Sequence, residues 1–380
     1  RTLRQEGFSG RISVVADEPE DFYERPPLSK AVLTSQADLP RLFPVDAVAG
    51  MAIDWYRPCT AVGLDRDRRR VRLQDGRELG YDRLVLATGA SARRPVAHWR
   101  DLPAVQTLRT WADACRLRKA LVAGRRLGVI GGGWIGLEVA ASARGLGLEV
   151  EVFEAQATLC ARSVDPVVSD WLRARHEAQG VVIHLGVTGL ELTAGRQAGV
   201  WLHAEDLAPR CFDLVVVGTG VRFNTDLARR AGLACDQGIV VDPRGQTSDP
   251  TIHAVGDVAQ HPAYGCCLQS WAFAQNQAVV AARAILGHSD GYDEPPWFWS
   301  DQYDSNIQIL GLPGQGVRFG CRGGPSDPVF FALDSSARLV QMVAVNQPRL
   351  IKLGKRWMTS GRVLDAQALA DPRFDPMAWR

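Results

Sequence analysis

The sequence predicts an α/β fold. Short apolar runs that end in glycine alternate with longer helical patterns, the order typical of strands followed by helices. One glycine-rich turn joins such a strand directly to such a helix. At 380 residues the chain is also too long for a single ordinary core, so two or three domains are expected.

The elements can be placed in chain order. We expect strands at 11–15, 84–87, 127–130, 149–153, 214–217 and 252–255, and helices at 135–146 and about 270–286. A proline-rich break at 294–296 marks a domain boundary. Beyond it, short strands around 308–310, 329–331 and 342–344 precede a helix near Ile351, a mixed pattern that differs from the earlier alternation.

Composition excludes several classes of protein. The formal net charge of +2 is no nucleic-acid footprint, and no apolar run approaches the roughly 18 residues that cross a bilayer. The N-terminus has no signal-peptide pattern, so a cytoplasmic protein is expected. Eight cysteines lie scattered without metal-ligand spacing, so no metal site is predicted, and Cys266-Cys267 is read as two plain thiols.

A dinucleotide fingerprint follows the strand at 127–130. The glycines of Gly131-x-Gly133-x-x-Gly136 permit a tight turn, close approach of a pyrophosphate, and close packing of helix on strand. The helix N-terminus then offers free N–H groups to the phosphates. The alternative, a glycine turn without a ligand, is disfavoured by the combination of strand, helix and a following acid.

That acid is Glu154, which follows the next strand about twenty residues on. Its carboxylate can accept hydrogen bonds from a ribose 2′-OH and would repel a 2′-phosphate. No arginine lies in the four residues that follow it. The sequence therefore predicts NADH in preference to NADPH.

Several longer strings resemble one known family. The strings are YERPPLSK at 23–30, ATGA at 87–90, GGGWIGLE at 131–138, VGTGV at 217–221, HAVGDV at 253–258 and PPWFWSDQY at 295–303. In order and spacing they are similar to those of the FAD-dependent NADH:ferredoxin reductases of aromatic-ring dioxygenase systems, of the biphenyl and 3-phenylpropionate dioxygenase type, with putidaredoxin reductase as wider kin.

The resemblance implies two dinucleotide-binding domains, Rossmann-like and of the glutathione-reductase type, plus a C-terminal α+β domain. The FAD-binding domain would comprise residues 1–104 and 239–290, and the NAD-binding domain residues 105–238. The C-terminal domain would span residues 291–380. FAD and NAD are the implied cofactors.

The same resemblance implies roles for residues of the matching strings. Arg25, Pro26 and Lys30 would border the flavin ring, with Lys30 near flavin N5 and paired with Glu138 across the nicotinamide pocket. A lysine there can stabilise negative charge that develops on the reduced flavin, so Lys30 and Glu138 are the expected catalytic residues. Without the motif, Lys30 would be a solvated lysine and Glu138 a helix N-terminal acid.

Further cofactor contacts are implied in the same way. Asp257 would bind the flavin ribitol, and Thr88 and Gly89 would form a turn that packs on FAD. Arg162 and Gly220 would line the adenosine half of NAD. Trp297 and Trp299 would lie near the flavin edge; the alternative is an ordinary core aromatic pair at strand spacing.

Two departures from the family pattern stand out. The first GxGxxG, which binds the ADP half of FAD, is absent, although Asp17 fits the acid position for the FAD ribose. Either about twenty residues precede the first residue of this sequence, or the protein does not hold FAD normally; we expect the first, because every later FAD element is present. The second departure is Gln269 and Phe273, where relatives usually carry Glu and Asn, which would alter contacts near the flavin.

The implied activity is that of an NADH:ferredoxin oxidoreductase. Hydride would pass from NADH to FAD, and single electrons to a Rieske-type or other [2Fe-2S] ferredoxin that binds transiently and serves an aromatic-ring dioxygenase. The slot where disulfide reductases carry a cysteine pair holds PPLSK, so a thiol relay is not expected. Two alternatives stay open: a rubredoxin- or putidaredoxin-type reductase for another chain, and a non-catalytic FAD/NAD-binding interaction protein.

Arg349, Lys352 and Arg356 have helical spacing. They would form either a docking face for an acidic ferredoxin or a solvated face without a partner.

Overall fold

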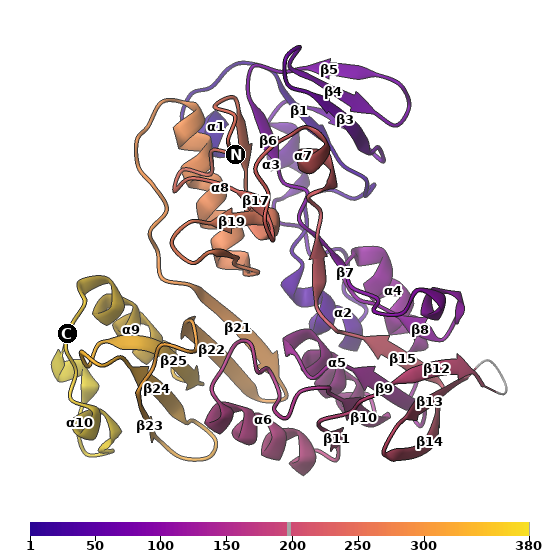
Figure 1. The fold of residues 1–380 in the computed structure, drawn as a ribbon, viewed down its shortest axis with the longest axis vertical. Coiled ribbons are helices and arrows are strands. Elements are labelled where there is room, and N and C mark those ends of the chain that lie inside the picture. The colour runs from indigo at the N-terminus through magenta and orange to yellow at the C-terminus, as the bar shows by residue number, and fades with distance from the viewer. Residues whose placement is uncertain (196–198, 380) are drawn as a thin grey trace. The chain divides into compact units, whose positions relative to one another are not determined.

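The computed structural model describes residues 1–195 and 199–379, and these form two compact units. Unit 1 comprises residues 1–24, 39–91 and 222–294, and unit 2 comprises residues 25–38, 92–221 and 295–380. Each unit is thus assembled from three stretches of chain (Figure 1). Within the described residues, no helix combines the length and apolarity needed to cross a bilayer.

Unit 1 contains several small sheets rather than one large one. Two of them are parallel pairs, β1 with β2 and β18 with β6. An antiparallel meander is formed by β3, β4 and β5, and in a further sheet β19 lies between β17 and β20. The elements are α1 (Thr2–Gln5), β1 (Ile12–Val15), α3 (Val45–Ala49), β2 (Ile53–Tyr56), β3 (Ala61–Asp65), β4 (Arg70–Leu73), β5 (Glu78–Gly80), β6 (Leu84–Leu86), α7 (Asp226–Arg230), β17 (Ile239–Val240), β18 (Ile252–Ala254), η4 (Gly256–Val258), β19 (Ala259–His261), β20 (Cys266–Cys267) and α8 (Trp271–Ile285). Strands β7 (Ala90–Ala92) and β16 (Val221–Phe223) pair where the chain passes from one unit to the other.

The first half of unit 2 is a parallel sheet in the order β11-β10-β9-β15-β8. Its central strand β9 and the neighbouring β15 are apolar and almost wholly buried, as parallel strands covered on both faces must be. The elements are η1 (Pro26–Ser29), α2 (Ala31–Thr34), η2 (Ala97–Asp101), β8 (Val105–Gln106), α4 (Trp111–Ala120), β9 (Arg126–Ile130), α5 (Trp134–Gly145), β10 (Glu149–Phe153), α6 (Pro166–Ala178), β11 (Val182–His184) and β15 (Leu214–Val217). An antiparallel sheet of β12 (Glu191–Ala194), β13 (Val200–Ala204) and β14 (Leu207–Phe212) accompanies it.

Helix α4 illustrates how local sequence fixes an element boundary. Thr110 accepts a hydrogen bond from the Asp113 N–H, and the Asp113 carboxylate accepts one from the Thr110 N–H, which together form a capping box. Such a cap stabilises a helix by about 1 kcal/mol. It also fixes where the chain turns away from β8.

The second half of unit 2 is an antiparallel sheet in the order β21-β22-β25-β24-β23. Helix α9 contacts β25 and β22, and its Ile351, Leu353 and Trp357 enter a core with Leu310, Met342 and other sheet residues (Figure 1). The elements are β21 (Trp297–Gln302), β22 (Ser305–Gly311), β23 (Arg318–Arg322), β24 (Val329–Leu333), β25 (Leu339–Val345), α9 (Pro348–Ser360), α10 (Ala366–Ala370) and η5 (Pro376–Trp379).

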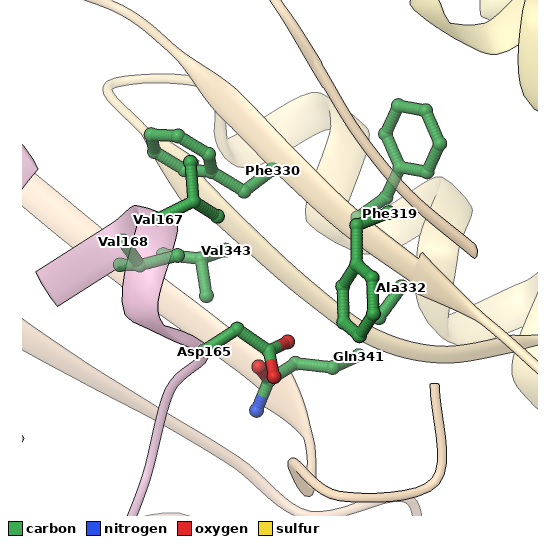
Figure 2. Close-up of a pocket in the computed structure, with 9 residues that line it drawn as sticks. Asp165, Val167, Val168, Phe319, Phe330, Ala332, Gln341 and Val343 are labelled. Carbon is green, nitrogen blue, oxygen red and sulfur yellow. The ribbon is translucent and has the colours of Figure 1, made fainter. Parts of the chain in front are cut away.

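Helix α6 lies against this antiparallel sheet. Figure 2 shows Val167 and Val168 of α6 near Phe330 and Val343, around a shallow pocket that Asp165, Phe319, Ala332 and Gln341 also line. Burial raises the pKa of Asp165. The two halves of unit 2 therefore share an apolar contact.

The α/β class and the two sheet types of unit 2 agree with the predicted fold. Every strand and helix predicted from the sequence has a counterpart, to within one to three residues at most ends. The three-domain division into 1–104 with 239–290, 105–238, and 291–380 stays a prediction.

Candidate active site

The residues predicted for the site divide between the two units. Unit 1 carries Asp17, Thr88, Gly89 and Asp257, and unit 2 carries Arg25, Pro26, Lys30, Gly131, Gly133, Gly136, Glu138, Glu154, Arg162, Gly220, Trp297 and Trp299. Each group is described within its own unit.

The glycine-rich turn connects β9 to α5 in unit 2. Gly131 has φ +106°, and a Cβ atom on it would lie 2.5 Å from the Gly218 carbonyl oxygen, so only glycine fits without displacement. A Cβ on Gly136 would collide with the Gly131 carbonyl oxygen. Gly133 differs, because no atom lies within 4 Å of the place its Cβ would take.

Open space at Gly133 is the observation that fits a dinucleotide. Gly133 is the N-cap residue of α5, and no side chain caps this helix end. The N–H groups of the first turn therefore have no side-chain cap, and a phosphate group can accept their hydrogen bonds. These residues fit the pyrophosphate of NAD.

Glu154 lies directly after β10 and closes this turn. One carboxylate oxygen accepts a hydrogen bond from the Gly132 N–H at 2.6 Å and the other from the Gln156 N–H at 2.7 Å. Nearby, burial raises the pKa of the Cys160 thiol well above its usual value, so this cysteine stays protonated beside the turn. The acid that we predict to bind a ribose therefore also holds the loop that would bind the phosphates.

Arg162 and Gly220 lie side by side in unit 2. Gly220 has φ +94°, and Arg162 Nη2 lies 3.2 Å from the position that a Cβ would occupy. Arg162 is exposed. An exposed guanidinium next to a residue without a side chain can contact the adenosine half of a dinucleotide, the role predicted for this pair.

Lys30 and Glu138 form an ion pair in unit 2, with Lys30 Nζ 2.9 Å from Glu138 Oε2. The side chains are 16% and 3% exposed respectively. Lys30 Nζ also donates to the Pro26 carbonyl oxygen at 3.0 Å, across the short 3₁₀ helix η1. Arg25 Nη1 donates to the Arg109 carbonyl oxygen at 2.6 Å, which ties the start of the same segment to the loop before α4.

Glu138 accepts hydrogen bonds from two further side chains that were not predicted from the sequence. Ser29 Oγ donates to Oε2, and Ser300 Oγ donates to Oε1 at 2.6 Å. All three side chains are nearly inaccessible to solvent. Three donors on one buried carboxylate compensate the cost of removing its charge from water.

Strand β21 presents two different faces. Trp297 and Trp299 stack with ring centroids 5.5 Å apart. On the opposite face, Phe298 packs edge-on against Trp134 of α5, while Ser300 reaches Glu138 one helical turn further along. The period-two spacing of a strand, which puts the two tryptophans on one face, thus also places a serine toward α5.

In unit 1, the predicted residues lie at the ends of strands. Asp17 is exposed, two residues after β1. Thr88 and Gly89 follow β6, where Gly89 has φ +60° and Thr88 exchanges two 2.8 Å hydrogen bonds with Asn224. Loops at strand ends are where α/β folds bind ligands.

Asp257 lies in η4, directly after β18. Beside it, Gln277 of α8 is completely buried and its Oε1 accepts a hydrogen bond from the Gly256 N–H at 2.9 Å. Its Nε2 has no acceptor among the described residues. A buried donor without an acceptor fits a polar group supplied by a bound molecule, and the hydroxyl-rich ribitol of FAD provides one.

The two departures from the family pattern have different surroundings. Phe273 is buried in unit 1 and packs edge-on against Tyr292 and His261. Gln269 is exposed. An apolar residue at position 273 therefore suits the core that surrounds it.

Two known protein families match nearly the whole chain. Residues 1–278 match the family described as pyridine nucleotide-disulphide oxidoreductase, and residues 297–378 match a reductase C-terminal domain. The chain is 40% identical to the ferredoxin–NAD(+) reductase component of the anthranilate 1,2-dioxygenase system of Burkholderia cepacia, over 97% of this chain and 93% of that protein.

Two solved structures are similar over nearly the whole chain. One is the ferredoxin reductase for the CYP199A2 system of Rhodopseudomonas palustris, with 35% identity, a TM-score of 0.94, and coverage of 100% of this chain and 95% of that chain. The other is putidaredoxin reductase in its covalent complex with putidaredoxin, with 36% identity, a TM-score of 0.93, and coverage of 99% and 93%.

Proposed function

This chain belongs to the pyridine nucleotide-disulphide oxidoreductase family, and we propose that it is an FAD-dependent NADH:ferredoxin reductase. The observation that carries the proposal is the buried Lys30–Glu138 ion pair. Its lysine lies in the PPLSK segment, where the disulfide reductases have their cysteines. Electrons therefore leave from the flavin rather than through a thiol relay.

The proposed electron donor is NADH. The Glu154 carboxylate, fixed by two backbone N–H groups, carries negative charge at the place where NADPH has its 2′-phosphate. Gly133 gives the pyrophosphate room, and Arg162 beside Gly220 supports the adenosine half.

Bound FAD supplies the exchange of one hydride for two single electrons. The protein's own residues would orient the two cofactors and balance their charge. Lys30 is held by Glu138 and by the Pro26 carbonyl oxygen, and its positive charge would stabilise negative charge on a flavin bound beside it. Asp257 and Gln277 would hold the ribitol, and the stacked Trp297 and Trp299 would cover the flavin edge.

The proposed acceptor is a [2Fe-2S] ferredoxin that serves an aromatic-ring dioxygenase. The relative from Burkholderia cepacia is the reductase component of the anthranilate 1,2-dioxygenase system, and the similar putidaredoxin reductase was solved in a covalent complex with putidaredoxin. A second candidate acceptor is the ferredoxin of another electron-transfer chain, because the Rhodopseudomonas palustris relative serves the CYP199A2 system.

A cytoplasmic location is also proposed. All eight cysteines are free thiols, including Cys266 and Cys267, which suits a reducing compartment. NADH, the proposed donor, is an intracellular reductant.

The test is steady-state reduction of purified [2Fe-2S] ferredoxins by the holoprotein with NADH or NADPH. The proposal predicts faster turnover with NADH and undiminished turnover after alkylation of accessible thiols. A protein that reduces disulfides but no ferredoxin would refute it. Comparing a dioxygenase ferredoxin with a cytochrome P450 ferredoxin distinguishes the two candidate acceptors.

A further inference from the structure

A continuous row of buried polar side chains extends from Glu138 away from Lys30. Ser300 Oγ, bonded to Glu138, lies 3.0 Å from Gln302 Nε2, and Gln302 Oε1 lies 2.8 Å from His176 Nε2. His176 Nδ1 in turn lies 2.9 Å from the Tyr303 hydroxyl. Ser300, Gln302 and His176 are each at most 2% exposed, and none of them belongs to the site predicted from the sequence.

The row joins three separate elements of unit 2. Glu138 is on α5, Ser300 and Gln302 are on one face of β21, and His176 is near the end of α6. Tyr303 occupies the turn between β21 and β22 with φ +57°, a left-handed conformation that is costly for a bulky side chain. That conformation accompanies the contact between its hydroxyl and His176.

The donor and acceptor roles along the row can be assigned from one end. An ionised Glu138 accepts from Ser300, so the single Ser300 proton points to Glu138 and Ser300 must accept from Gln302. The Gln302 amide then turns its oxygen to His176, which requires a proton on His176 Nε2.

The other end agrees with this assignment. Burial lowers the pKa of His176 to about 4, so the ring is neutral near pH 7 and Nδ1, which carries no proton, accepts from Tyr303. Burial also raises the pKa of Tyr303, so its hydroxyl keeps the proton that it donates. All four hydrogen bonds therefore run in one direction, toward Glu138.

We propose that Tyr303, His176, Gln302 and Ser300 are positioning residues for the Lys30–Glu138 pair. Because every hydrogen bond of the row runs toward Glu138 and ends on Oε1, the row fixes that oxygen as an acceptor. The other oxygen then faces Lys30. The inference rests on the proposed function, since Lys30 acts on the flavin.

The first test needs no turnover. Histidine labelled with ¹⁵N in the FAD-loaded protein reports which ring nitrogen carries the proton, and the His176→Gln variant identifies the His176 signal by its loss. The proposal predicts a neutral ring protonated on Nε2 throughout the neutral pH range. A proton on Nδ1 would overturn it.

The second test compares matched variants at two positions. His176→Leu removes the donor to Gln302, whereas His176→Gln can place an amide N–H near the Nε2 position. Gln302→Met breaks the row at its centre with little change in volume. His203→Gln, at a histidine of β13 outside the row, is the control.

Anaerobic flavin reduction by NADH is the rate to measure, together with FAD content. We expect His176→Leu and Gln302→Met to slow reduction of the FAD-loaded protein about tenfold, the effect of about one hydrogen bond between neutral groups, with little change in KM for NADH. His176→Gln should recover most of the rate. Equal rates in all FAD-loaded variants would overturn the proposal, because a purely structural role lowers only the melting temperature.

Tyr303→Phe guards against variants that do not fold, because it removes one hydroxyl at the end of the row. Gln302 still requires the proton on His176 Nε2, so the proposal predicts that the tautomer stays the same while the signal of Nδ1, which has lost its donor, shifts; a proton that moves to Nδ1 would contradict it. If the wild-type flavin is not reduced by NADH, the proposed function fails, but the tautomer measurement still decides whether the row is directional.

Discussion

At the scale of single residues, Glu138 illustrates what a buried charge requires. Its carboxylate is 3% exposed and is satisfied by Lys30, Ser29 and Ser300. Lys30→Met leaves that charge with neutral donors alone. Removing one partner of a buried pair typically destabilises by about 3 kcal/mol or more, so we expect the urea midpoint to fall strongly.

The double variant Lys30→Met/Glu138→Gln tests the cause. It removes the uncompensated charge, so it should be more stable than Lys30→Met alone. Lys119→Met, at an exposed position on α4, should change stability by no more than about 0.5 kcal/mol. Strictly additive effects of the two substitutions would show that the pair is not coupled.

The burial of His176 leads us to expect that the stability of the protein depends on pH. Its pKa is lowered by burial from 6.5 to about 4 in the folded protein, so between these values the unfolded chain binds more protons than the folded one. The free energy of unfolding should therefore fall as the pH drops from 6.5 toward 4, by up to ~1.4 kcal/mol per pH unit from this group. Above pH 6.5 this contribution is constant.

Unfolding in urea at several pH values measures that slope. His176→Gln removes the titrating ring and should flatten the curve, whereas His203→Gln should not. If the wild type and His176→Gln have parallel curves, His176 is not buried as a neutral base.

At the scale of elements, the turn between β9 and α5 separates structural from binding roles of glycine. Gly133→Ala adds a methyl group where the protein leaves open space, so the melting temperature should change little while KM for NADH rises. Gly145→Ala, at the other end of α5, also meets no neighbour and should affect neither quantity. A Gly133→Ala variant with normal KM would place the pyrophosphate elsewhere.

Helix α9 tests the acceptor surface. Arg349, Lys352 and Arg356 are exposed on one side of α9, whereas Ile351, Leu353 and Trp357 face the core. Replacing the three cations with glutamine should weaken the salt dependence of ferredoxin reduction, since docking of an acidic partner depends on such charges. NADH oxidation with ferricyanide should be unchanged.

A matched control removes Arg68, Arg70 and Arg72 from the β3–β4 hairpin, which alters the net charge equally. Salt dependence that falls equally in both variants would indicate a general charge effect. If the salt dependence of ferredoxin reduction is unchanged in the α9 variant, that helix face is a solvated face without a partner, which is the other alternative that the sequence allowed.

Local sequence patterns predicted the helices and strands better than they predicted the contacts between distant side chains. The strand at 127–130 and the helix after it follow from apolar runs and glycines that act within a few residues of themselves. The Trp297–Trp299 pair follows from strand spacing. By contrast, helix α6 has a hydrophobic face that we did not predict, and with it His176 was missed.

At the scale of the whole molecule, the polar residues around Glu138 that the sequence did not reveal were all missed for one reason. Ser300 lies 162 residues from Glu138, and Gln302 lies 126 residues from His176. No local signal reports such a meeting, because it depends on how β21 packs on α5 and α6. WFWSDQ consists of three aromatic residues followed by three polar ones, so the sequence did not indicate which polar side chains of β21 face α5 and α6.

The central claim concerns what NADH does to this protein. The most direct measurement is the absorbance spectrum of the FAD-loaded protein before and after one equivalent of NADH without oxygen. The account predicts a flavin band that bleaches rapidly and returns when an oxidised [2Fe-2S] ferredoxin is added. A band that persists in the presence of NADH would contradict it.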